Sequence, residues 1–247
     1  MMLCIDIGNT ATKMGLVTGA RVSSRVVIPA NAKARSVDQV LVRFLRGVRN
    51  IDGVAICSVR PDATNPVVDA VIGATGLYPI VVNHRTPMPL AIAVPRPARV
   101  GTDRLCAAYG ALRGRRRDAI VITVGTAITV NLVRDRTFRG GVILPGVGMS
   151  LAAMHTFTAQ LPKLDLEGAL PRRIDDTEAA MRWGAVLSGA GGIRLAVELL
   201  DRRRHTPRVV TGGDADRIAR WLPSNSVVAP DLTLLGLASI ALYNRGA

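Results

Sequence analysis

One short segment near the start of the chain carries a carboxylate, a glycine turn and a lysine. In CIDIGNTATK, Asp6 ends an apolar run, Gly8, Asn9 and Thr10 form a turn, and Lys13 lies on the returning run. Such a turn aims backbone N–H groups and the Thr10 hydroxyl at a phosphate, while Lys13 meets its charge and Asp6 holds hydrated magnesium. A plain asparagine-type hairpin turn explains the same residues equally well. The segment therefore predicts either a phosphate site or a simple turn.

A second candidate segment is VGTDR, at the start of a predicted helix. An acid at this position complements the helix dipole, and the unpaired N–H groups of a helix start bind anions. In the functional interpretation, Asp103 takes a proton from a substrate hydroxyl and Arg104 holds a carboxylate. In the alternative, Thr102 and Asp103 only cap the helix and Arg104 is a surface charge. The residues alone leave both interpretations open.

Three glycine-containing segments of the second half also end predicted strands. VITVGTAITVN, residues 121–131, turns at Gly125 and suits either a buried hairpin or a loop that holds a phosphate. GGVILPGVGMS, residues 140–150, joins a strand to a helix through glycines that allow close backbone approach. TGGDAD ends a strand at Gly212 and Gly213 and opens a helix capped by Asp214, so that a flat ring can lie against the backbone. A tight turn is the alternative for each segment, but the set favours a ligand site.

The hydrophobic pattern predicts two copies of a β-β-β-α-β-α plan. The expected strands are 2–7, 13–17, 22–28, 54–59, 80–82, 119–124, 127–133, 138–144 and 208–210. The expected helices are 36–46, 62–74, 102–112, 147–157, 176–200 (weakened at 189–192) and 231–243, and residues 88–100 form an extended proline-rich connector. This pattern indicates an α/β fold of duplicated architecture, with domains at 1–115 and 116–247 and an interdomain cleft.

Composition narrows the class of protein. Of the 247 residues, 49% are hydrophobic and only 3% aromatic, which predicts an aliphatic core of strands covered by helices on both faces. The formal net charge is +14, but the basic residues cluster only at 113–117 and 202–204, where helices are expected to end. No aromatic residues accompany these clusters, so a nucleic-acid partner is not favoured. The simpler explanation of the net positive charge is that it attracts anionic small molecules.

The remaining sequence features predict a cytoplasmic protein that does not enter a membrane. The three cysteines lie far apart in apolar runs, which indicates reduced core thiols. The start of the chain has no basic region before its first acid, so no signal peptide is expected, and the most apolar late segment is too short for a membrane span. His-x-x-x-His and Gly-x-Ser-x-Gly patterns do not occur in the sequence, which gives no support to zinc or serine hydrolases.

Taken together, these motifs resemble the type III pantothenate kinases, of the acetate and sugar kinase, Hsp70 and actin superfamily. The resemblance runs through DIGNTATK, ICSVRP, GTDR, VGTAITVN, GGVILPGVGMS, TAQLP, TEAAMRWGA, VTGGDAD and DLTLLGL, in that order along almost the whole chain. It implies two ribonuclease-H-like domains in tandem, a homodimer, and phosphorylation of pantothenate by ATP with magnesium, the first step toward coenzyme A.

The resemblance also implies roles for individual residues. The residues that would bind the ATP phosphates and magnesium are Asp6, Gly8, Asn9, Thr10 and Lys13, with Thr126 contacting ATP from the second domain and Gly212 and Gly213 forming the adenosine loop. Those that would contact pantothenate are Gly101, Thr102, Asp103 and Arg104, with Asp103 as proton acceptor and Thr177 supplied across the dimer.

Three positions depart from the family pattern. Thr123 stands where the family usually has an aspartate that binds an activating potassium or ammonium ion, Asn131 replaces another usual aspartate, and Val94 aligns loosely with a substrate-contacting tyrosine. These changes argue against dependence on a monovalent cation. They motivate two further hypotheses: a weakened or inactive homologue with a ligand-binding or regulatory role, and a kinase of the same superfamily that acts on another small alcohol.

Overall fold

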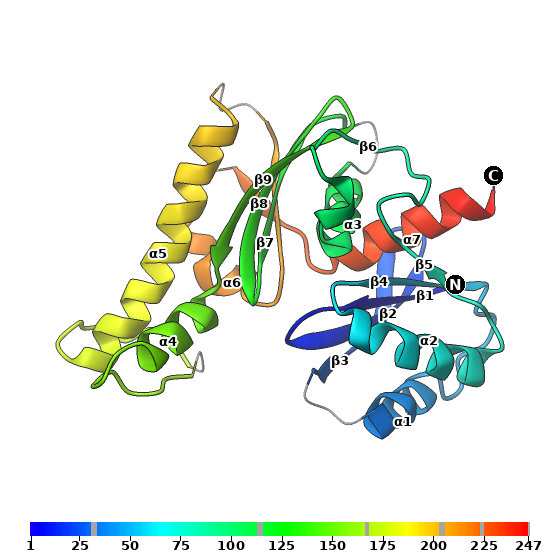
Figure 1. Cartoon of the computed structure of the whole chain (residues 1–247), viewed down its shortest axis with the longest axis horizontal. Helices are drawn as coiled ribbons and strands as arrows, with labels where there is room; N and C mark the ends of the chain where they lie inside the picture. Colours follow the sequence, from blue (N-terminus) through cyan, green and yellow to red (C-terminus); the bar gives the residue numbers. More distant parts are fainter. Residues whose placement is uncertain (31–33, 113–115, 166–167, 203–205, 223–224, 247) are drawn as a thin grey trace. The chain divides into compact units, whose positions relative to one another are not determined.

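The computed structural model describes residues 1–30, 34–112, 116–165, 168–202, 206–222 and 225–246. Four basic residues of the two clusters singled out above lie outside this set, namely Arg113, Arg115, Arg203 and Arg204. The chain divides into two units, each described on its own (Figure 1). Unit 1 comprises Met1–Arg117, Arg134–Arg139 and Asp231–Ala247, and unit 2 comprises Asp118–Val133 and Gly140–Pro230.

Unit 1 contains a five-stranded sheet in the order β3-β2-β1-β4-β5. Its strands are β1 (Met2–Ile7), β2 (Ala11–Thr18), β3 (Arg21–Pro29), β4 (Gly53–Ser58) and β5 (Ile80–Val81). The first three strands form the predicted antiparallel meander, and β4 and β5 continue the sheet in parallel. The helices of unit 1 are α1 (Ala34–Phe44), α2 (Pro61–Thr75), α3 (Thr102–Ala111) and α7 (Leu232–Arg245).

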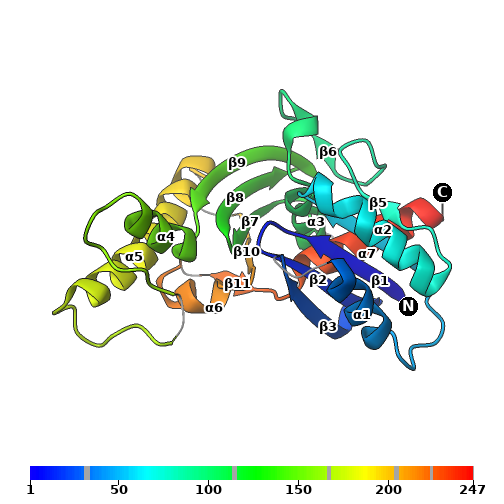
Figure 2. The same cartoon turned by 60° about the horizontal axis from the view of Figure 1, so that its bottom comes forward.

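Strand β1 is buried on both faces, and its alternating side chains divide the unit into two cores. Leu3, Ile5 and Ile7 pack with residues of α1 and α2. Met2 and Cys4 pack with residues of α3 and α7 on the opposite face. Helices α1 and α2 lie on one side of the sheet and α7 on the other (Figure 2). Because side chains alternate along a strand, Asp6 belongs to the face that looks toward α3 and α7.

Helices α3 and α7 approach each other closely because both have a glycine at their contact. A side chain at Gly236 would lie 1.8 Å from the carbonyl oxygen of Cys106, and one at Gly110 would lie 2.5 Å from that of Leu232. The short interhelical distance lets α7 cover β1 and β4 while α3 stays packed on β4. The last helix of the chain therefore completes the core around its first strand.

The proline-rich connector of unit 1 is more ordered than the sequence predicts. It contains a two-residue strand, β6 (Ala91–Ile92), and a 3-10 helix, η1 (Pro97–Arg99). Strand β6 pairs in parallel with Thr137 and Phe138. The turn before Thr137 places Asp135 and Arg136 in the left-handed region, with φ values of 49° and 54°. The Arg136 side chain donates to the Pro89 carbonyl of the connector at 3.1 Å. The connector is extended at β6, as expected, but not at the 3-10 helix η1. The pairing of β6 was not expected, because non-local backbone pairing leaves no periodic trace in sequence.

Unit 2 is built on a mixed sheet whose strands follow the order β11-β10-β7-β8-β9. These strands are β7 (Ala119–Val124), β8 (Ala127–Arg134), β9 (Thr137–Pro145), β10 (Arg208–Thr211) and β11 (Ser226–Val228). The helices are α4 (Val147–Thr156), α5 (Thr177–Leu200), α6 (Ala215–Ile218) and the 3-10 turn η2 (Ala219–Trp221). Residues of β7, β8 and β10 form one aliphatic core with α4, α5 and α6.

Helix α5 runs without interruption through the glycines expected to weaken it. A side chain at Gly189 would lie 2.9 Å from Ile128, and one at Gly192 would lie 2.7 Å from Leu144, so these glycines let the helix lie close to the sheet. Among the described residues, α5 alone is long and apolar enough by composition to cross a membrane. That indication is weak, since α5 places nine buried residues in unit 2.

The domain boundary expected at residue 115 remains a prediction. In the structure, the contacts of α7 and of residues 134–139 lie within unit 1, although the predicted second domain contains both segments. Strand β11 and the short helix η2 were not expected, because elements of three residues carry no reliable periodic pattern.

Candidate functional site

Asp6 lies at the end of β1, between two side chains that share its face of the sheet. It pairs in register with Lys13 on β2 and with Cys57 on β4. The Cys57 thiol donates to Asp6 Oδ1 at 3.5 Å. The sheet therefore places an acid, a thiol and a lysine next to one another.

The Asp6 carboxyl group has a raised pKa. Burial, and to a lesser extent the negative charge of Asp103, raise its pKa to about 6, although Lys13 and the Cys57 hydrogen bond act in the opposite direction. A carboxylate with so little water around it gains strongly from a positive partner. The electrostatics at the end of β1 therefore favour a bound cation.

Asp103 lies in the first turn of α3, and burial raises its pKa above the usual range. The N–H of Arg104, the Arg104 charge and Lys13 act in the opposite direction. The absence of a side chain at Gly101 makes room for this carboxylate, because a Cβ there would lie 2.5 Å from Asp103 Oδ1. Asp6 and Asp103, far apart in sequence, thus share one electrostatic environment within unit 1.

Thr102 binds the backbone of the strand end next to Asp6. Its hydroxyl accepts from the Ser58 N–H at 3.0 Å and donates to the Ser58 carbonyl at 2.9 Å. The helix cap considered from sequence is absent, since the residue before α3 is Gly101 and makes no side-chain capping bond. Ser58 was missed in the sequence because a serine that binds through its backbone carries no motif.

Arg104 packs against an aromatic ring. Its guanidinium lies over Phe138 at 5.6 Å from the ring centroid, and partial burial lowers its pKa below the ordinary value. Phe138 is fully buried next to β6, so the ring is fixed in place. The ring fixes the plane of the guanidinium, and arginine is the side chain best suited to bind a carboxylate with two parallel hydrogen bonds.

Not every N–H group of the turn after β1 is free to bind a phosphate. The Gly8 N–H donates to the Ala11 carbonyl at 3.0 Å, so this donor closes the turn. Asn9 and Thr10 are exposed at its tip, and Lys13 is half-buried behind them. The turn therefore presents the side chains of Asn9 and Thr10 outward.

In unit 2, the predicted hairpin forms with its turn at Gly125 and Thr126. The Gly125 N–H donates to the Ala127 carbonyl at 3.2 Å, and Thr126 is exposed. Gly146 lies against this turn, since a side chain there would lie 2.0 Å from the Gly125 carbonyl oxygen. The glycine of the strand-to-helix segment thus supports the hairpin.

A row of neutral polar side chains crosses the sheet of unit 2 beside this hairpin. Thr123 pairs in register with Thr129 on one side and with Thr211 on the other. Asn131 is fully buried and donates to the Thr129 hydroxyl at 3.0 Å. The environment of Asn131 suits an amide, because an ionised carboxylate there would need a cation to offset its desolvation.

The TGGDAD segment turns sharply at Gly212, which has a φ of 111°. A side chain at Gly212 would lie 2.0 Å from the Val124 carbonyl oxygen, and the Asp214 N–H donates to that oxygen at 3.2 Å. Gly213 faces open space. Asp214 precedes α6 but makes no side-chain capping bond, so the expected cap was wrong, and its carboxylate instead pairs with Arg217 at 3.3 Å.

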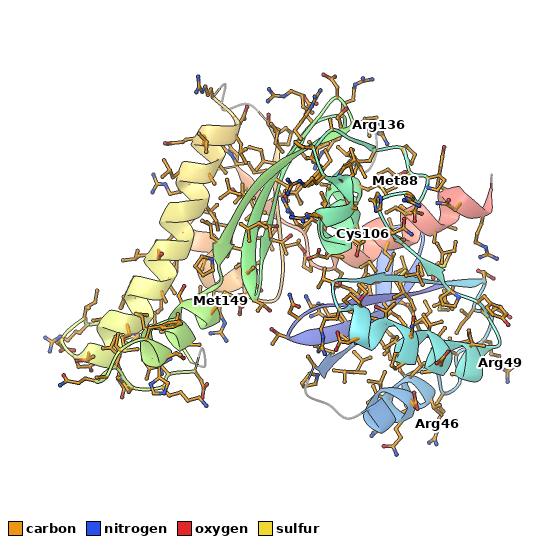
Figure 3. The ribbon with its side chains drawn as sticks, viewed as in Figure 1. Arg46, Arg49, Met88, Cys106, Arg136 and Met149 are labelled. Atoms are coloured by element: carbon orange, nitrogen blue, oxygen red, sulfur yellow. The ribbon has the colours of Figure 1, made fainter. Side chains whose placement is uncertain are left out.

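A cavity of about 440 Å³ lies beside α6 in unit 2. Its apolar lining includes Val147, Leu151, Leu170 and Val186, and its charged lining includes Arg182, Asp216, Arg217 and Arg220. Met149, labelled in Figure 3, lies on α4 and is exposed. A flat apolar group with an anionic end matches this lining in shape and charge.

Thr177 is exposed at the first turn of α5, where the preceding Asp176 carboxylate accepts from the Ala179 N–H at 2.7 Å. Val94 follows β6 and is half-buried. The predicted site residues therefore fall into two groups: residues 6–13 and 101–104 in unit 1, and Thr123, Thr126, Thr177, Gly212 and Gly213 in unit 2. Among the described residues, no group of three or more His, Cys, Asp or Glu side chains forms a metal cluster.

Comparisons with solved structures show which fold this chain has. The Campylobacter jejuni protein described as a Baf family transcriptional activator has 18% identity and a TM-score of 0.62, covering 99% of this chain and 100% of that one. A ROK family glucokinase from Streptomyces griseus, solved with glucose and AMPPNP, has 16% identity and a TM-score of 0.53, covering 97% and 98%. These likenesses confirm the α/β fold with two ribonuclease-H-like domains in tandem that the sequence predicts.

Sequence relatives identify the family within that fold. The family model for type III pantothenate kinases matches residues 2–198. A type III pantothenate kinase from Roseiflexus sp. (strain RS-1) is 33% identical over 255 residues, which cover 99% of this chain and 100% of the relative. This chain therefore belongs to the type III pantothenate kinase family.

Proposed function

We propose that this protein transfers the γ-phosphoryl group of ATP to the hydroxyl of pantothenate, forming 4'-phosphopantothenate, the first step of coenzyme A biosynthesis. The observation that carries this proposal is the electrostatic coupling of buried Asp6 with partly buried Asp103, two acids with raised pKa values that both feel the charge of Lys13. Phosphoryl transfer needs such a site, because catalysis depends mainly on positioning and on stabilising charge.

In the proposed reaction, Asp103 accepts the proton of the pantothenate hydroxyl as its oxygen attacks the γ-phosphorus. The bond between that phosphorus and the β–γ bridging oxygen breaks, and ADP leaves with that oxygen. Burial of Asp103 raises its pKa, which makes the carboxylate a stronger proton acceptor than an exposed aspartate. Lys13 faces the same site and offsets negative charge on the transferred group.

Magnesium fits the residues around Asp6. This ion takes oxygen ligands and is usually held by one or two carboxylates together with substrate phosphates and water. Asp6 provides such a carboxylate, with Oδ1 fixed by the Cys57 thiol and its ionisation opposed by the charge of Asp103. A bound magnesium ion would neutralise phosphate charge, while Asp6 holds and orients it.

Arg104 is the proposed partner of the pantothenate carboxylate. Its guanidinium is partly buried and held on the Phe138 ring. An arginine already fixed in orientation loses little side-chain freedom when it binds a carboxylate. We assign substrate contact to Gly101 as well, because its missing side chain opens the space beside Asp103.

Unit 2 is proposed to hold the rest of ATP. Thr126 lies exposed at the hairpin turn and is proposed to contact a phosphate, and Gly212 and Gly213 offer a bare backbone surface to the adenosine. The cavity beside α6, the helix that follows this loop, supplies apolar side chains and three arginines. These features support binding of an aromatic base that carries an anionic tail.

The neutral row at Thr123 and Asn131 supports a kinase that requires no potassium or ammonium. A hydroxyl and a buried amide bind a monovalent cation less strongly than two carboxylates would. We expect phosphopantothenate formation with magnesium-ATP to differ by less than about threefold among sodium, potassium and ammonium salts. A coupled ADP assay with product identification by mass spectrometry measures this.

The same assay tests the proposed function as a whole. Absence of phosphopantothenate in all three salts, with ATP binding measurable by calorimetry, would instead identify a non-catalytic homologue. Faster turnover of a sugar than of pantothenate would identify a kinase for another alcohol.

Gly101→Ala tests the space beside Asp103. The added methyl group would displace the carboxylate rather than the backbone, so we expect the fold to persist while turnover falls by about 10- to 100-fold. Gly73→Ala in α2, where a side chain meets open space, is the matched control. Full activity of Gly101→Ala would show that the space is not needed. Circular dichroism checks the fold, and the coupled ADP assay checks turnover.

We further propose a homodimer in the cytoplasm. Helix α5, which begins at Thr177, exposes Leu187, Leu195 and Leu199. These leucines are spaced by multiples of four residues and so form one apolar face, which suits contact with a second copy of the chain. The buried cysteines are free thiols, as is usual in a reducing compartment. A monomeric mass by light scattering would contradict the dimer.

A further inference from the structure

The two acids of unit 1 are tied to the same two backbone residues. The Val59 N–H donates to the carbonyl of Ile7, the neighbour of Asp6, at 3.0 Å. Both backbone groups of Ser58 bind the hydroxyl of Thr102, the neighbour of Asp103, at 3.0 and 2.9 Å. The segment of Ser58 and Val59 therefore links the end of β1 to the start of α3.

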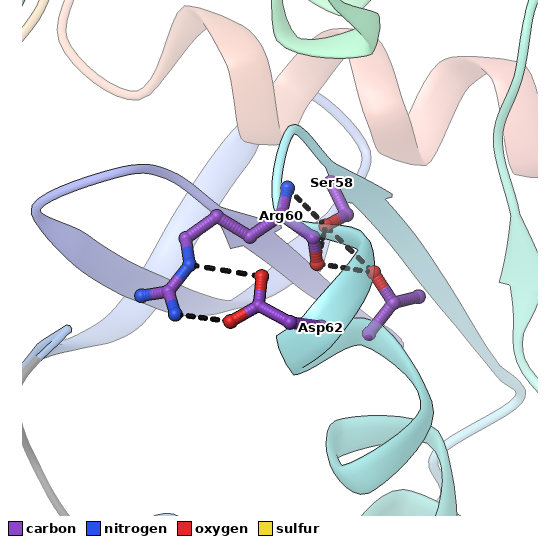
Figure 4. Close-up of polar contacts among 4 residues, drawn as sticks. Ser58, Arg60 and Asp62 are labelled. Carbon is purple, nitrogen blue, oxygen red and sulfur yellow. Dashed lines mark hydrogen bonds and ion pairs between the residues drawn. The ribbon is translucent and has the colours of Figure 1, made fainter.

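The Ser58 side chain of this linking segment also contacts the start of α2, separately from the backbone bonds to Thr102. The Ser58 hydroxyl accepts from the Arg60 N–H at 3.0 Å and from the Thr64 hydroxyl at 2.8 Å (Figure 4). Arg60 in turn pairs with Asp62, its Nε donating at 3.3 Å. The side chain of Ser58 thus hydrogen-bonds residues at the start of α2, while its backbone hydrogen-bonds Thr102 at the start of α3.

The Thr102 hydroxyl has little capacity left for a substrate. A hydroxyl has one proton to donate, and that of Thr102 goes to the Ser58 carbonyl, while one of its lone pairs receives the Ser58 N–H. The substrate-binding role that the resemblance implies for Thr102 is therefore poorly matched by its hydrogen bonds. Its geometry suits a contact between two parts of the protein.

We propose that Thr102 is a positioning residue whose hydroxyl, bound to Ser58, fixes the spacing between the carboxylates of Asp103 and Asp6. This inference rests on the proposed function, in which one acid accepts a proton while the other holds magnesium. A shift of about 1 Å in such a pair costs on the order of 100-fold in rate. Residues that orient metal ligands and catalytic groups have effects of about 10- to 100-fold when removed.

The test compares three variants in steady-state kinetics. Thr102→Val keeps the shape of the side chain but removes both hydrogen bonds, so we expect kcat to fall by about 10- to 100-fold, with KM for pantothenate and ATP within about twofold. Thr102→Ser restores the hydroxyl and should return kcat to within about threefold of the original. Thr64→Val removes a hydroxyl from the same serine without touching α3 and should leave kcat within about twofold.

Three results would overturn the inference. They are an unchanged kcat in Thr102→Val, an equal loss in Thr64→Val, and a loss confined to the KM for pantothenate, which would make Thr102 a substrate contact. Thr102→Ala, a better helix former, replaces Thr102→Val if the valine variant does not fold.

A separate measurement keeps this inference distinct from the proposed function. If the unmodified protein does not phosphorylate pantothenate, the proposed function fails, and the same variants are compared by calorimetric binding of magnesium alone. The spacing role then predicts about tenfold weaker binding in Thr102→Val and no change in Thr64→Val. Equal magnesium affinity in both variants would reject it.

Discussion

Asp103→Asn is expected to abolish phosphorylation of pantothenate while leaving ATP binding nearly intact. The amide fits the same space beside Gly101 but cannot accept the hydroxyl proton, and loss of a general base costs about 100- to 10,000-fold in rate. Turnover is measured by mass spectrometry of phosphopantothenate, and ATP affinity by calorimetry with magnesium.

Asp69→Asn is the matched control for this variant. It makes the same chemical change at an exposed position of α2 and should keep full turnover. Near-normal turnover of Asp103→Asn would show that another group accepts the proton. Loss of ATP binding together with turnover would instead place Asp103 in nucleotide binding.

Asp6→Asn is expected to lose activity and gain stability at the same time. Because the folded-state pKa of Asp6 is about 6, against an ordinary value of 3.8, the native protein holds this proton more tightly than the unfolded chain does. Stability is therefore lost as pH rises through the window from about 4 to about 6. Above that window the buried negative charge lowers the free energy of unfolding by about 3 kcal/mol.

The asparagine variant avoids this penalty. At pH 7.5 in EDTA we expect Asp6→Asn to be more stable than the unmodified protein by about 3 kcal/mol, and at pH 4.5 by about 1 kcal/mol. Turnover should fall by about 100- to 1,000-fold, because the magnesium ligand is gone. Urea unfolding at the two pH values gives the stability difference. A variant less stable than the original at pH 7.5 would contradict the buried charge.

Local patterns were enough to predict most of the fold. The alternation in residues 2–28 gave the meander of β1, β2 and β3, because side chains two apart share a face. The segment 140–150 was expected to allow close backbone approach, and the structure confirms this at Gly146, where a side chain would lie 2.0 Å from the Gly125 carbonyl oxygen. Patterns within one element are visible in sequence because they repeat at its own period.

Contacts between distant segments could not be predicted in the same way. The Cys57 thiol on Asp6, the Phe138 ring under Arg104 and the Ser58 backbone on Thr102 each join residues far apart in the chain. Cys106, labelled on α3 in Figure 3, is an example, since an isolated cysteine in sequence gives no sign that it packs beside Cys57. The acids of unit 1 could therefore be predicted from the sequence, but the residues that contact and position them could not.

The packing of α7 on β1 affects how the chain must fold as it is synthesised. Figure 1 shows the red helix beside the blue strands, and the close contact at Gly236 and Gly110 fixes it on α3. A ribosome adds about 5 to 20 residues per second, so β1 waits on the order of 10 to 50 s for the helix that covers one of its faces. During that interval the apolar side chains of Met2 and Cys4 lack their final partners. Nascent chains stalled before residue 231 should therefore bind chaperones through unit 1.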